Sequence, residues 1–406
     1  MTGETVRADL AVMGGGLTGM ALALAAAAGG AKVAVVEAQP LATMTAAPFD
    51  GRVTAVALGS KRLLDAIGAW DGMAAHAQPI LDIEVGEADG PARVRYDHRT
   101  IGDEPLGWIV ENRTIRQALI ARAQAHSGIE VLAPARVVGM TLEEAGRRLD
   151  LADGRRVLAP LLAVAEGRES RTRADLGIRA RRRAYGQTAF VCTLALEHDH
   201  GGLAVERFFP DGPFAMLPMT GRRSSIVWAL DDRLAGDISG LDDLDFLGEV
   251  AERFGDDLGD LALEGPRFAY PLGLVEAERA TAPRAALVGD ALRGIHPIAG
   301  QGWNLALRDV GALAEILADR RRLGLDPGAP EALDRYENWR RFDGFALVAA
   351  TDGINRLFAN DLFPLKLARN FGLGLVERAL PVKRRIMRGA MGLAGDLPRL
   401  MRGLPL

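Results

Sequence analysis

The N-terminal part of the chain alternates between short apolar runs and a long stretch of small side chains. Residues 8–13 and 32–37 each form a compact apolar run of strand length, and the alanine-rich segment 17–28 between them has the length of a helix. Two buried strands that are joined by a helix form a parallel βαβ unit. The pattern therefore predicts such a unit at the start of the chain.

The glycines of this unit have the spacing of a nucleotide-binding turn. Gly14, Gly16 and Gly19 occupy the positions of the pattern GxGxxG, and Glu37 ends the second apolar run. In such a turn the first glycine permits a tight bend, the second leaves room for a pyrophosphate, and the third lets helix and strand approach closely. The helix N-terminus offers N–H groups to the phosphates, and Glu37 can accept hydrogen bonds from a ribose. The motif predicts a bound dinucleotide, and both FAD and NAD fit it.

A second strand, loop and helix late in the chain distinguishes between these two cofactors. Residues 284–290, RAALVGD, indicate a buried strand that ends at Asp290, and residues 303–321 carry apolar side chains at helical spacing. A carboxylate at the carboxyl end of a strand can hold a sugar-alcohol hydroxyl, and the following helix N-terminus can stabilise negative charge. A flavin offers both targets, in its ribityl chain and in the ring edge that gains charge on reduction. We therefore expect both loops to converge on FAD.

Composition excludes several other classes of protein. The chain has 406 residues, 49% of them hydrophobic and 25% charged, which is typical of a globular protein large enough for two domains. Its net charge of −4 gives no general attraction to nucleic acid, so we expect no such partner. One cysteine, Cys192, and scattered histidines predict neither a disulfide nor a metal centre. No apolar window reaches the length of a spanning helix, so we expect a cytoplasmic location, free or peripheral on the inner membrane.

The C-terminal stretch combines basic and apolar side chains. Its cations are Lys383, Arg384, Arg385, Arg388, Arg399 and Arg402, against the single acid Asp396. Such a stretch suits an anionic membrane surface or a partner helix. A solvated C-terminal helix explains the same pattern, and the sequence leaves these alternatives open.

Several longer motifs resemble those of one flavoprotein family. The most specific are HPIAGQGWNLALRD at 296–309, YENWRR at 336–341 and TDGINRLFAN at 351–360. Further matches in the expected order are DGRVTAVAL at 50–58, GWIVEN at 107–112, YGQTAFV at 185–191, ERFFPDGPFAMLP at 206–218 and YPL at 270–272. Together they extend over essentially the whole chain, which resembles the class A flavoprotein aromatic monooxygenases and specifically the ubiquinone-biosynthesis FAD-dependent hydroxylase family.

The resemblance implies which residues hold the nucleotide part of the cofactor. Gly14, Gly16, Gly19 and Glu37 would hold the adenosine half of FAD, and Arg52 would reach the pyrophosphate.

The resemblance also implies which residues surround the flavin ring. Asn112 is expected beside the flavin, and Asp290 on the ribityl chain or the pyrophosphate. Pro297 and the backbone from Gly300 to Gly302 would line the isoalloxazine ring, with Asn304 nearby. The catalytic candidates are His296, Pro297 and Gln301. For the histidine, catalytic and purely positional roles are both open.

Two motifs depart from the family pattern. Glu166 stands where the second dinucleotide motif usually has aspartate, although Ser170 and Arg173 are in place. Leu292 and Arg293 stand where alanine and histidine are common, so no histidine at that position enters the mechanism. The role of Glu166 in binding is left open.

We predict an α/β fold in which a FAD-binding Rossmann-like (GR2-type) domain is interleaved with a β-sheet substrate domain, plus a helical C-terminal region. The FAD-binding domain is discontinuous because its two loops must meet in space. The predicted boundaries are 1–80, 105–180 and 266–325 for this domain, 81–104 and 181–265 for the β-rich substrate domain, and 326–406 for the helical region. A hairpin turn is expected at Asp89 and Gly90, and the arginine run 179–183 is interpreted as a solvated connection.

The function that the resemblance implies is hydroxylation of the aromatic ring of a polyprenylated phenol or quinol intermediate in ubiquinone biosynthesis, via a flavin hydroperoxide. Dioxygen would be consumed, NADPH or NADH would be the transient electron donor, and other ubiquinone-biosynthesis proteins are candidate partners. The cofactor carries the chemistry in such an enzyme, which explains why no Ser/His/Asp set stands out. Three alternatives are a class A hydroxylase of a small soluble aromatic compound, a flavin oxidase or dehydrogenase, and a non-enzymatic scaffold of a biosynthetic complex.

Overall fold

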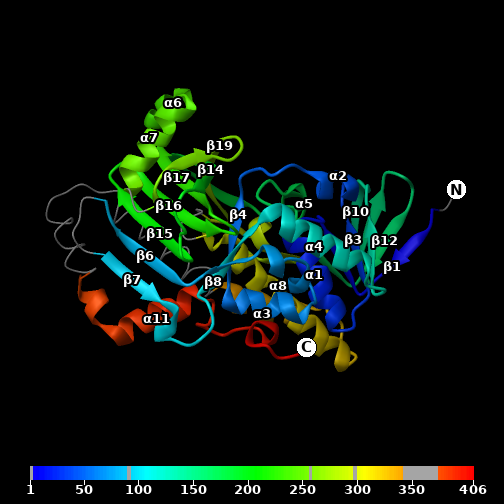
Figure 1. Cartoon of the computed structure of the whole chain (residues 1–406). Helices are drawn as coiled ribbons and strands as arrows, with labels where there is room; N and C mark the ends of the chain where they lie inside the picture. The colour runs from blue at the N-terminus through cyan, green and yellow to red at the C-terminus, as the bar shows by residue number, and fades with distance from the viewer. Residues whose placement is uncertain (1–2, 89–92, 256–257, 296–299, 342–373) are drawn as a thin grey trace.

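A mostly parallel sheet forms the centre of one half of the molecule (Figure 1). The computed structural model describes residues 3–88, 93–255, 258–295, 300–341 and 374–406. The order of the six strands is β20 (Thr281–Ala282), β21 (Ala285–Leu287), β13 (Leu161–Val164), β2 (Leu10–Met13), β3 (Val33–Val36) and β9 (Ile129–Leu132). Only the edge strand β20 runs antiparallel to its neighbour. This order brings the ends of β2 and β21, which are far apart in sequence, to the same edge of the sheet.

Helices cover this sheet, and their composition follows from that position. The three main helices are α1 (Leu17–Ala28), α4 (Asn112–Gln124) and α8 (Gly302–Arg322). Their apolar side chains share one hydrophobic core with the strands, of which β2, β3, β13 and β21 are buried at every position. Helix α1 is buried from Gly19 to Ala27, so its small side chains permit close packing on several sides.

A larger sheet forms the second half of the molecule, to the left in Figure 1. Its path is β22 (Arg293–Gly294), β19 (Phe268–Ala277), β14 (Ala180–Leu196), β17 (Arg223–Asp231), β16 (Gly212–Met219), β15 (Leu203–Phe209), β6 (Asp82–Glu87) and β7 (Arg93–Asp97), with β18 (Leu261–Leu263) also paired to β14. Helices α7 (Asp243–Phe254) and α6 (Asp232–Gly240) pack on one face of this sheet. Their apolar side chains share a buried core with Trp228 and Phe214 of the sheet. The other face is available to line a cavity.

Two small sheets and several short helices complete the described fold. The three-stranded sheet comprises β4 (Val53–Ala57), β8 (Gly107–Glu111) and β5 (Gln78–Ile80), and the four-stranded sheet comprises β1 (Thr5–Arg7), β12 (Arg156–Ala159), β11 (Gly146–Leu151) and β10 (Val137–Glu143). The other helices are α2 (Leu41–Ala46), α3 (Leu58–Ala66), α5 (Arg171–Asp175) and α11 (Leu380–Ala390), with 3-10 turns η1 (Trp70–Gly72), η2 (Ala74–His76), η3 (His98–Thr100), η5 (Gly289–Ala291) and η7 (Arg399–Arg402). Residues 330–341 are also helical. Side chains of β4 and β8 pack with side chains of the large sheet and of α11, so the three-stranded sheet joins the two halves.

The α/β class and the N-terminal βαβ unit are confirmed, since β2, α1 and β3 lie inside the predicted segments. The interpretation of residues 179–183 as a connection is wrong for 180–183, because these residues begin β14 and pair with β19. The arginines in these residues are exposed, so the segment lacks the apolar positions by which a hydropathy pattern predicts a strand. Strand β19 (Phe268–Ala277) pairs within the large sheet, although the predicted boundary at 266 assigns it to the nucleotide domain. The hairpin expected at Asp89 and Gly90 lies outside the described residues.

Candidate active site

The glycine-rich turn between β2 and α1 has the geometry that each predicted role requires. Gly14 has a φ of +98°, a backbone conformation that glycine adopts without strain. A β-carbon on Gly19 would lie 1.9 Å from the carbonyl oxygen of Gly14, so only glycine permits this approach. A β-carbon on Gly16 would have no described atom within 4 Å. The side of Gly16 therefore faces open space at the N-terminus of α1, where a pyrophosphate can approach.

Glu37 follows β3 and is held beside this turn by backbone N–H groups. Its Oε2 accepts a hydrogen bond from the Gly15 N–H at 2.6 Å, and its Oε1 accepts one from the Gln39 N–H at 2.8 Å. A carboxylate can accept more than two hydrogen bonds, so capacity for ribose hydroxyls remains. The backbone orients the carboxylate for that contact.

The second loop lies directly against the first. Gly289 follows β21 with a φ of +63°, and a β-carbon there would lie 2.9 Å from Cγ2 of Thr18 in the first turn of α1. Asp309 of α8 holds the loop, because its Oδ2 accepts a hydrogen bond from the Gly289 N–H at 3.1 Å. Its Oδ1 accepts one from Nε of Arg340 at 2.7 Å, and both side chains are at most 1% exposed. Two loops almost three hundred residues apart are thus fixed at one place.

Asp290 presents its carboxylate to Arg168 at the second loop. The side chain is 41% exposed, and its Oδ2 accepts a hydrogen bond from Nε of Arg168 at 3.2 Å. Arg168 also donates to the carbonyl oxygen of Ile295 at 2.9 Å, which ties both ends of the loop together. Burial lowers the pKa of the Arg52 guanidinium, but the hydrogen bond and charge of Asp50, with a contribution from Asp290, raise this pKa overall. The charge of Asp290 therefore acts on the Arg52 guanidinium.

Arg52 and Asn112 lie side by side where β4 begins and β8 ends. The Asn112 N–H donates to the carbonyl oxygen of Arg52 at 3.1 Å, and its Oδ1 accepts a hydrogen bond from the hydroxyl of Thr54 at 2.6 Å. The Arg52 guanidinium is half-exposed and pairs with Asp50 at 2.5 Å. Both predicted residues are thus brought to the same edge of the site.

The start of α8 is joined to β4 through Asn304. This buried side chain donates to the carbonyl oxygen of Ala55 at 2.7 Å and accepts from the Ala57 N–H at 3.0 Å. It also donates to Oε1 of Gln301 at 3.2 Å, and Gly300 precedes this pair with a φ of +61°. Asn304 positions the loop and β4 relative to each other, and a direct contact with FAD stays a prediction.

His296 and Pro297 lie outside the described residues, as does the family motif at 351–360. Their predicted roles stay predictions.

Arg168 was missed by the sequence reasoning, although the motif that carries it was noted and Arg173 was named in it. Arg173 is buried and donates to the carbonyl oxygens of Ala291 at 2.9 Å and Arg168 at 2.9 Å. Glu166 accepts hydrogen bonds from the Ser170 hydroxyl at 2.7 Å and from a backbone N–H of α5 at 3.1 Å. The second dinucleotide motif therefore folds a short capped helix that directs Arg168 and Arg173 at the second loop. The sequence carries no signal for this role, because it depends on β13 lying beside β21 in the sheet.

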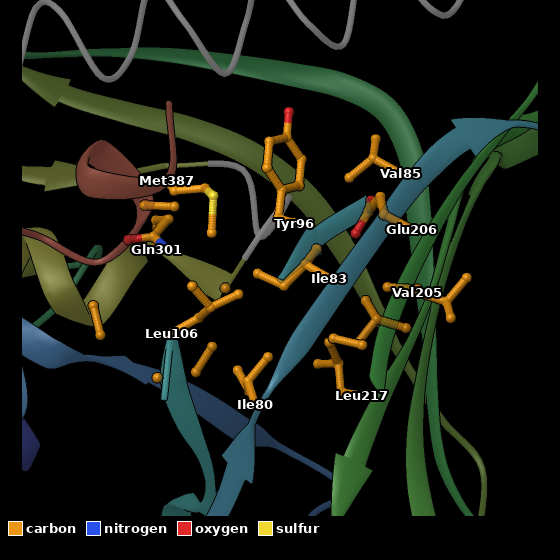
Figure 2. A pocket seen from close by; sticks show the side chains of 18 of the residues that line it. Ile80, Ile83, Val85, Tyr96, Leu106, Val205, Glu206, Leu217, Gln301 and Met387 are labelled. Atoms are coloured by element: carbon orange, nitrogen blue, oxygen red, sulfur yellow. The ribbon is translucent and has the colours of Figure 1, made fainter. Parts of the chain in front are cut away.

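A cavity of about 640 Å³ lies between the large sheet, β4, the start of α8 and α11. Figure 2 shows side chains of several elements converging on this space. Among its described lining residues the polar side chains are Tyr96, Glu206 and Gln301, and only Glu206 is a carboxylate. Because Gly300 and Gln301 line one part of it, the cavity reaches the loop that is expected to hold the flavin ring. A cavity with this lining suits a largely apolar ligand.

The residues present fit FAD on geometric grounds. The structure supplies an acceptor for the ribose at Glu37, an open approach for the pyrophosphate at Gly16 and a carboxylate for the ribityl chain at Asp290. Within the described ranges, no cluster of three or more histidine, cysteine or acidic residues is suited to a metal ion. In the same part of the chain, no helix combines the length and hydropathy needed to cross a membrane.

Comparison with known proteins agrees with this geometry. A family model described as FAD binding domain matches residues 7–351. The ubiquinone hydroxylase UbiL of Rhodospirillum rubrum is 47% identical over 402 residues, which cover 98% of this chain and 94% of the relative. The 3-demethoxyubiquinol 3-hydroxylase of Escherichia coli is 33% identical over 387 residues, which cover 95% and 98%.

A solved structure of low sequence identity has the same fold. The p-nitrophenol 4-monooxygenase PnpA of Pseudomonas putida superposes with a TM-score of 0.77 at 18% identity, and the alignment covers 97% of this chain and 99% of that one. The fold, the converging loops and the sequence relatives lead to one assignment. This chain belongs to the ubiquinone-biosynthesis FAD-dependent hydroxylases, a family of class A flavoprotein aromatic monooxygenases.

Proposed function

We propose that this protein hydroxylates the aromatic ring of a polyprenylated phenol or quinol intermediate in ubiquinone biosynthesis, with dioxygen and with NADPH or NADH as electron donor. The names of the sequence relatives support ubiquinone precursors as the substrate class. The observation that carries the proposal is the 640 Å³ cavity, whose described walls are almost wholly apolar and which extends from the flavin loop to α11.

The cavity has the chemistry that an isoprenoid-substituted ring requires. Each buried CH₂ group of a hydrocarbon tail stabilises binding by about 0.8 kcal/mol, so a tail favours apolar walls strongly. The volume suits a ring and the first part of a tail, since pockets of roughly 300–1,000 Å³ hold ligands of that size. Side chains such as Ile83, Leu106 and Leu217 provide those walls.

The chain's own residues position the reactants and exclude water. FAD, when bound, supplies the activation of dioxygen, which no amino-acid side chain provides. Gly300 and Gln301 bring the N-terminus of α8 to the cavity, where its partial positive charge can stabilise negative charge on the ring edge. The apolar walls keep water from the reacting atoms, which protects a reactive oxygen donor from side reactions.

We also propose that α11 contacts an anionic membrane surface. Leu380, Val382 and Ile386 are 44%, 48% and 44% exposed, and Arg384 and Arg385 are exposed between them. Each basic side chain near anionic lipid contributes about 1 kcal/mol. Because Ile386 also lines the cavity, a tail could pass from the lipid to the ring site along this helix. Flotation with vesicles that contain anionic lipid would test this, and an Arg384→Glu, Arg385→Glu variant should bind them less.

The central experiment combines genetics with product analysis. Strains that each lack one ring hydroxylase would receive the wild-type gene or an Asp290→Ala control, and accumulated intermediates would be identified by mass. We expect the wild type to rescue at least one strain and labelled dioxygen to place one label in the product. Rescue of none by a protein with bound FAD would favour a soluble aromatic substrate. An unlabelled product would indicate an oxidase, and rescue by the Asp290→Ala variant would indicate a scaffold.

A further inference from the structure

One carboxylate interrupts the apolar wall that the large sheet presents to the cavity. Glu206 lies on β15, opposite Val85 of β6 and Ala215 of β16 in the strand register. Ala204 and Phe208, two positions before and after it, face the same side and also line the cavity. Figure 2 shows the Glu206 carboxyl directed from the strand into the cavity. An acid therefore occupies the middle of a hydrophobic surface.

Nothing in the described part of the chain neutralises this acid. No hydrogen bond or ion pair of its carboxyl is found among the described residues, and the next residue, Arg207, points to the opposite face, where it pairs with Glu84 at 2.6 Å. Burial raises the pKa of Glu206 to about 7, so the protonated and charged forms are both accessible near neutral pH. Glu206 is only partly buried, and its carboxyl opens into the apolar cavity without a described protein partner. An acid in such a wall is expected where a ligand supplies the partner.

We propose that Glu206 binds a hydroxyl group on the aromatic ring of the substrate and thereby positions the ring in the cavity. The inference rests on the proposed function. In a polyprenylated phenol or quinol the tail is pure hydrocarbon, so the oxygens on the ring are the only polar atoms of the substrate. A carboxylate accepts a hydrogen bond from a phenolic O–H, and a carboxylic acid donates one to a ring oxygen. Gln301 is already engaged with Asn304, so Glu206 provides a polar contact that is free for the substrate.

The test compares two ligands that differ in one hydrogen-bond donor. The probes are a phenol with a short prenyl substituent and its methyl ether. Binding to the FAD-loaded protein is followed through the flavin absorbance. The variants are Glu206→Leu, which removes the polar group, and Glu206→Gln, which retains a hydrogen-bonding group. The matched control is Glu252→Gln, an exposed carboxylate on α7, which covers the opposite face of the same sheet.

We expect the wild type and the control to bind the phenol about 10- to 100-fold more tightly than the ether, the usual range for a hydrogen bond to a charged group. Glu206→Leu should lose this preference, and Glu206→Gln should keep only part of it. When the ring is misplaced, more of the electrons taken from NADPH or NADH reduce dioxygen to hydrogen peroxide without hydroxylating the substrate. The ratio of hydrogen peroxide formed to NADPH or NADH oxidised should therefore rise in the Leu variant and stay low in the control.

The inference is overturned if Glu206→Leu binds FAD and keeps the wild-type preference, or if the wild type shows no preference. If Glu206→Leu does not retain FAD, the test uses Glu206→Gln instead. The inference is overturned if this variant keeps both the wild-type preference for the phenol over the ether and the wild-type ratio of hydrogen peroxide to oxidised NADPH or NADH. A wild type that binds the phenol through Glu206 but hydroxylates no prenylated ring would refute the proposed function and leave the Glu206 contact standing. The two failures are therefore distinguishable.

Discussion

The same small substitution should have opposite effects at two glycines of the first loop. In Gly19→Ala the new β-carbon would lie 1.9 Å from the carbonyl oxygen of Gly14, against at least 3.4 Å for an ordinary contact, so turn and helix must separate by about 1.5 Å. Overpacking of this kind costs roughly 1–3 kcal/mol or more, and the better helix propensity of alanine returns only about 1 kcal/mol. We therefore expect Gly19→Ala to lower the stability of the FAD-free protein by about 2 kcal/mol.

In Gly16→Ala the β-carbon meets no described atom within 4 Å, and the backbone at φ −70° and ψ −171° is extended, which alanine adopts freely. The FAD-free protein should be as stable as the wild type or more stable by about 0.4–1 kcal/mol. The same methyl group occupies the space that the pyrophosphate needs, so FAD should bind about 10- to 100-fold more weakly.

Urea unfolding of the FAD-free proteins and FAD titration followed by flavin fluorescence measure the two effects separately. Gly236→Ala on α6, which also has open space at its β-carbon, is the control: it should leave FAD affinity unchanged and raise stability by up to about 1 kcal/mol through helix propensity. Two results would refute the reasoning. One is a FAD-free Gly16→Ala protein as unstable as Gly19→Ala, and the other is a Gly16→Ala protein with wild-type affinity for FAD.

Three further predictions test the second loop and the cavity. Arg168→Met should weaken FAD binding about 10-fold by flavin titration, because the carboxylate of the second loop loses its partner, whereas Arg171→Met on the exposed side of α5 should not. Asp309→Asn should lower the free energy of unfolding in urea by about 3–5 kcal/mol, since it leaves the buried charge of Arg340 without this carboxylate, and a loss below 1 kcal/mol would contradict the role of the pair. The folded protein retains the proton of Glu206 up to a pKa of about 7, whereas the unfolded chain releases it near 4.5, so the contribution of this group to stability falls as pH rises through that window. Glu206→Gln should therefore be more stable than the wild type at pH 8 by up to about 3 kcal/mol and equal to it at pH 4, and a difference that does not change with pH would refute this assignment.

The sequence predicts those parts of the site that depend on local backbone geometry. The turn at Gly14 and the spacing to Glu37 are properties of one short segment, so their pattern is visible without the fold. The ion pair of Asp309 with Arg340 and the contacts of Arg168 depend on residues that only tertiary packing brings together. An arginine in a polar motif has the same local pattern whether it is solvated or directed at a cofactor loop. Its role therefore becomes visible only when β13 and β21 are seen to be neighbours.

Strand β4 explains how a cofactor site and a substrate site built from different sheets can keep a fixed separation. Asn304 binds the backbone of β4 at both Ala55 and Ala57, and a β-carbon on Gly300 would lie 3.0 Å from the side chain of Ala55. Ala55 also lines the cavity, so one strand borders the loop at Gly300 and the cavity at once. Oxygen transfer to a ring carbon depends on placement to within about 0.5 Å, which loops alone rarely maintain. A buried amide that joins α8 to β4 gives the two sites a common rigid element.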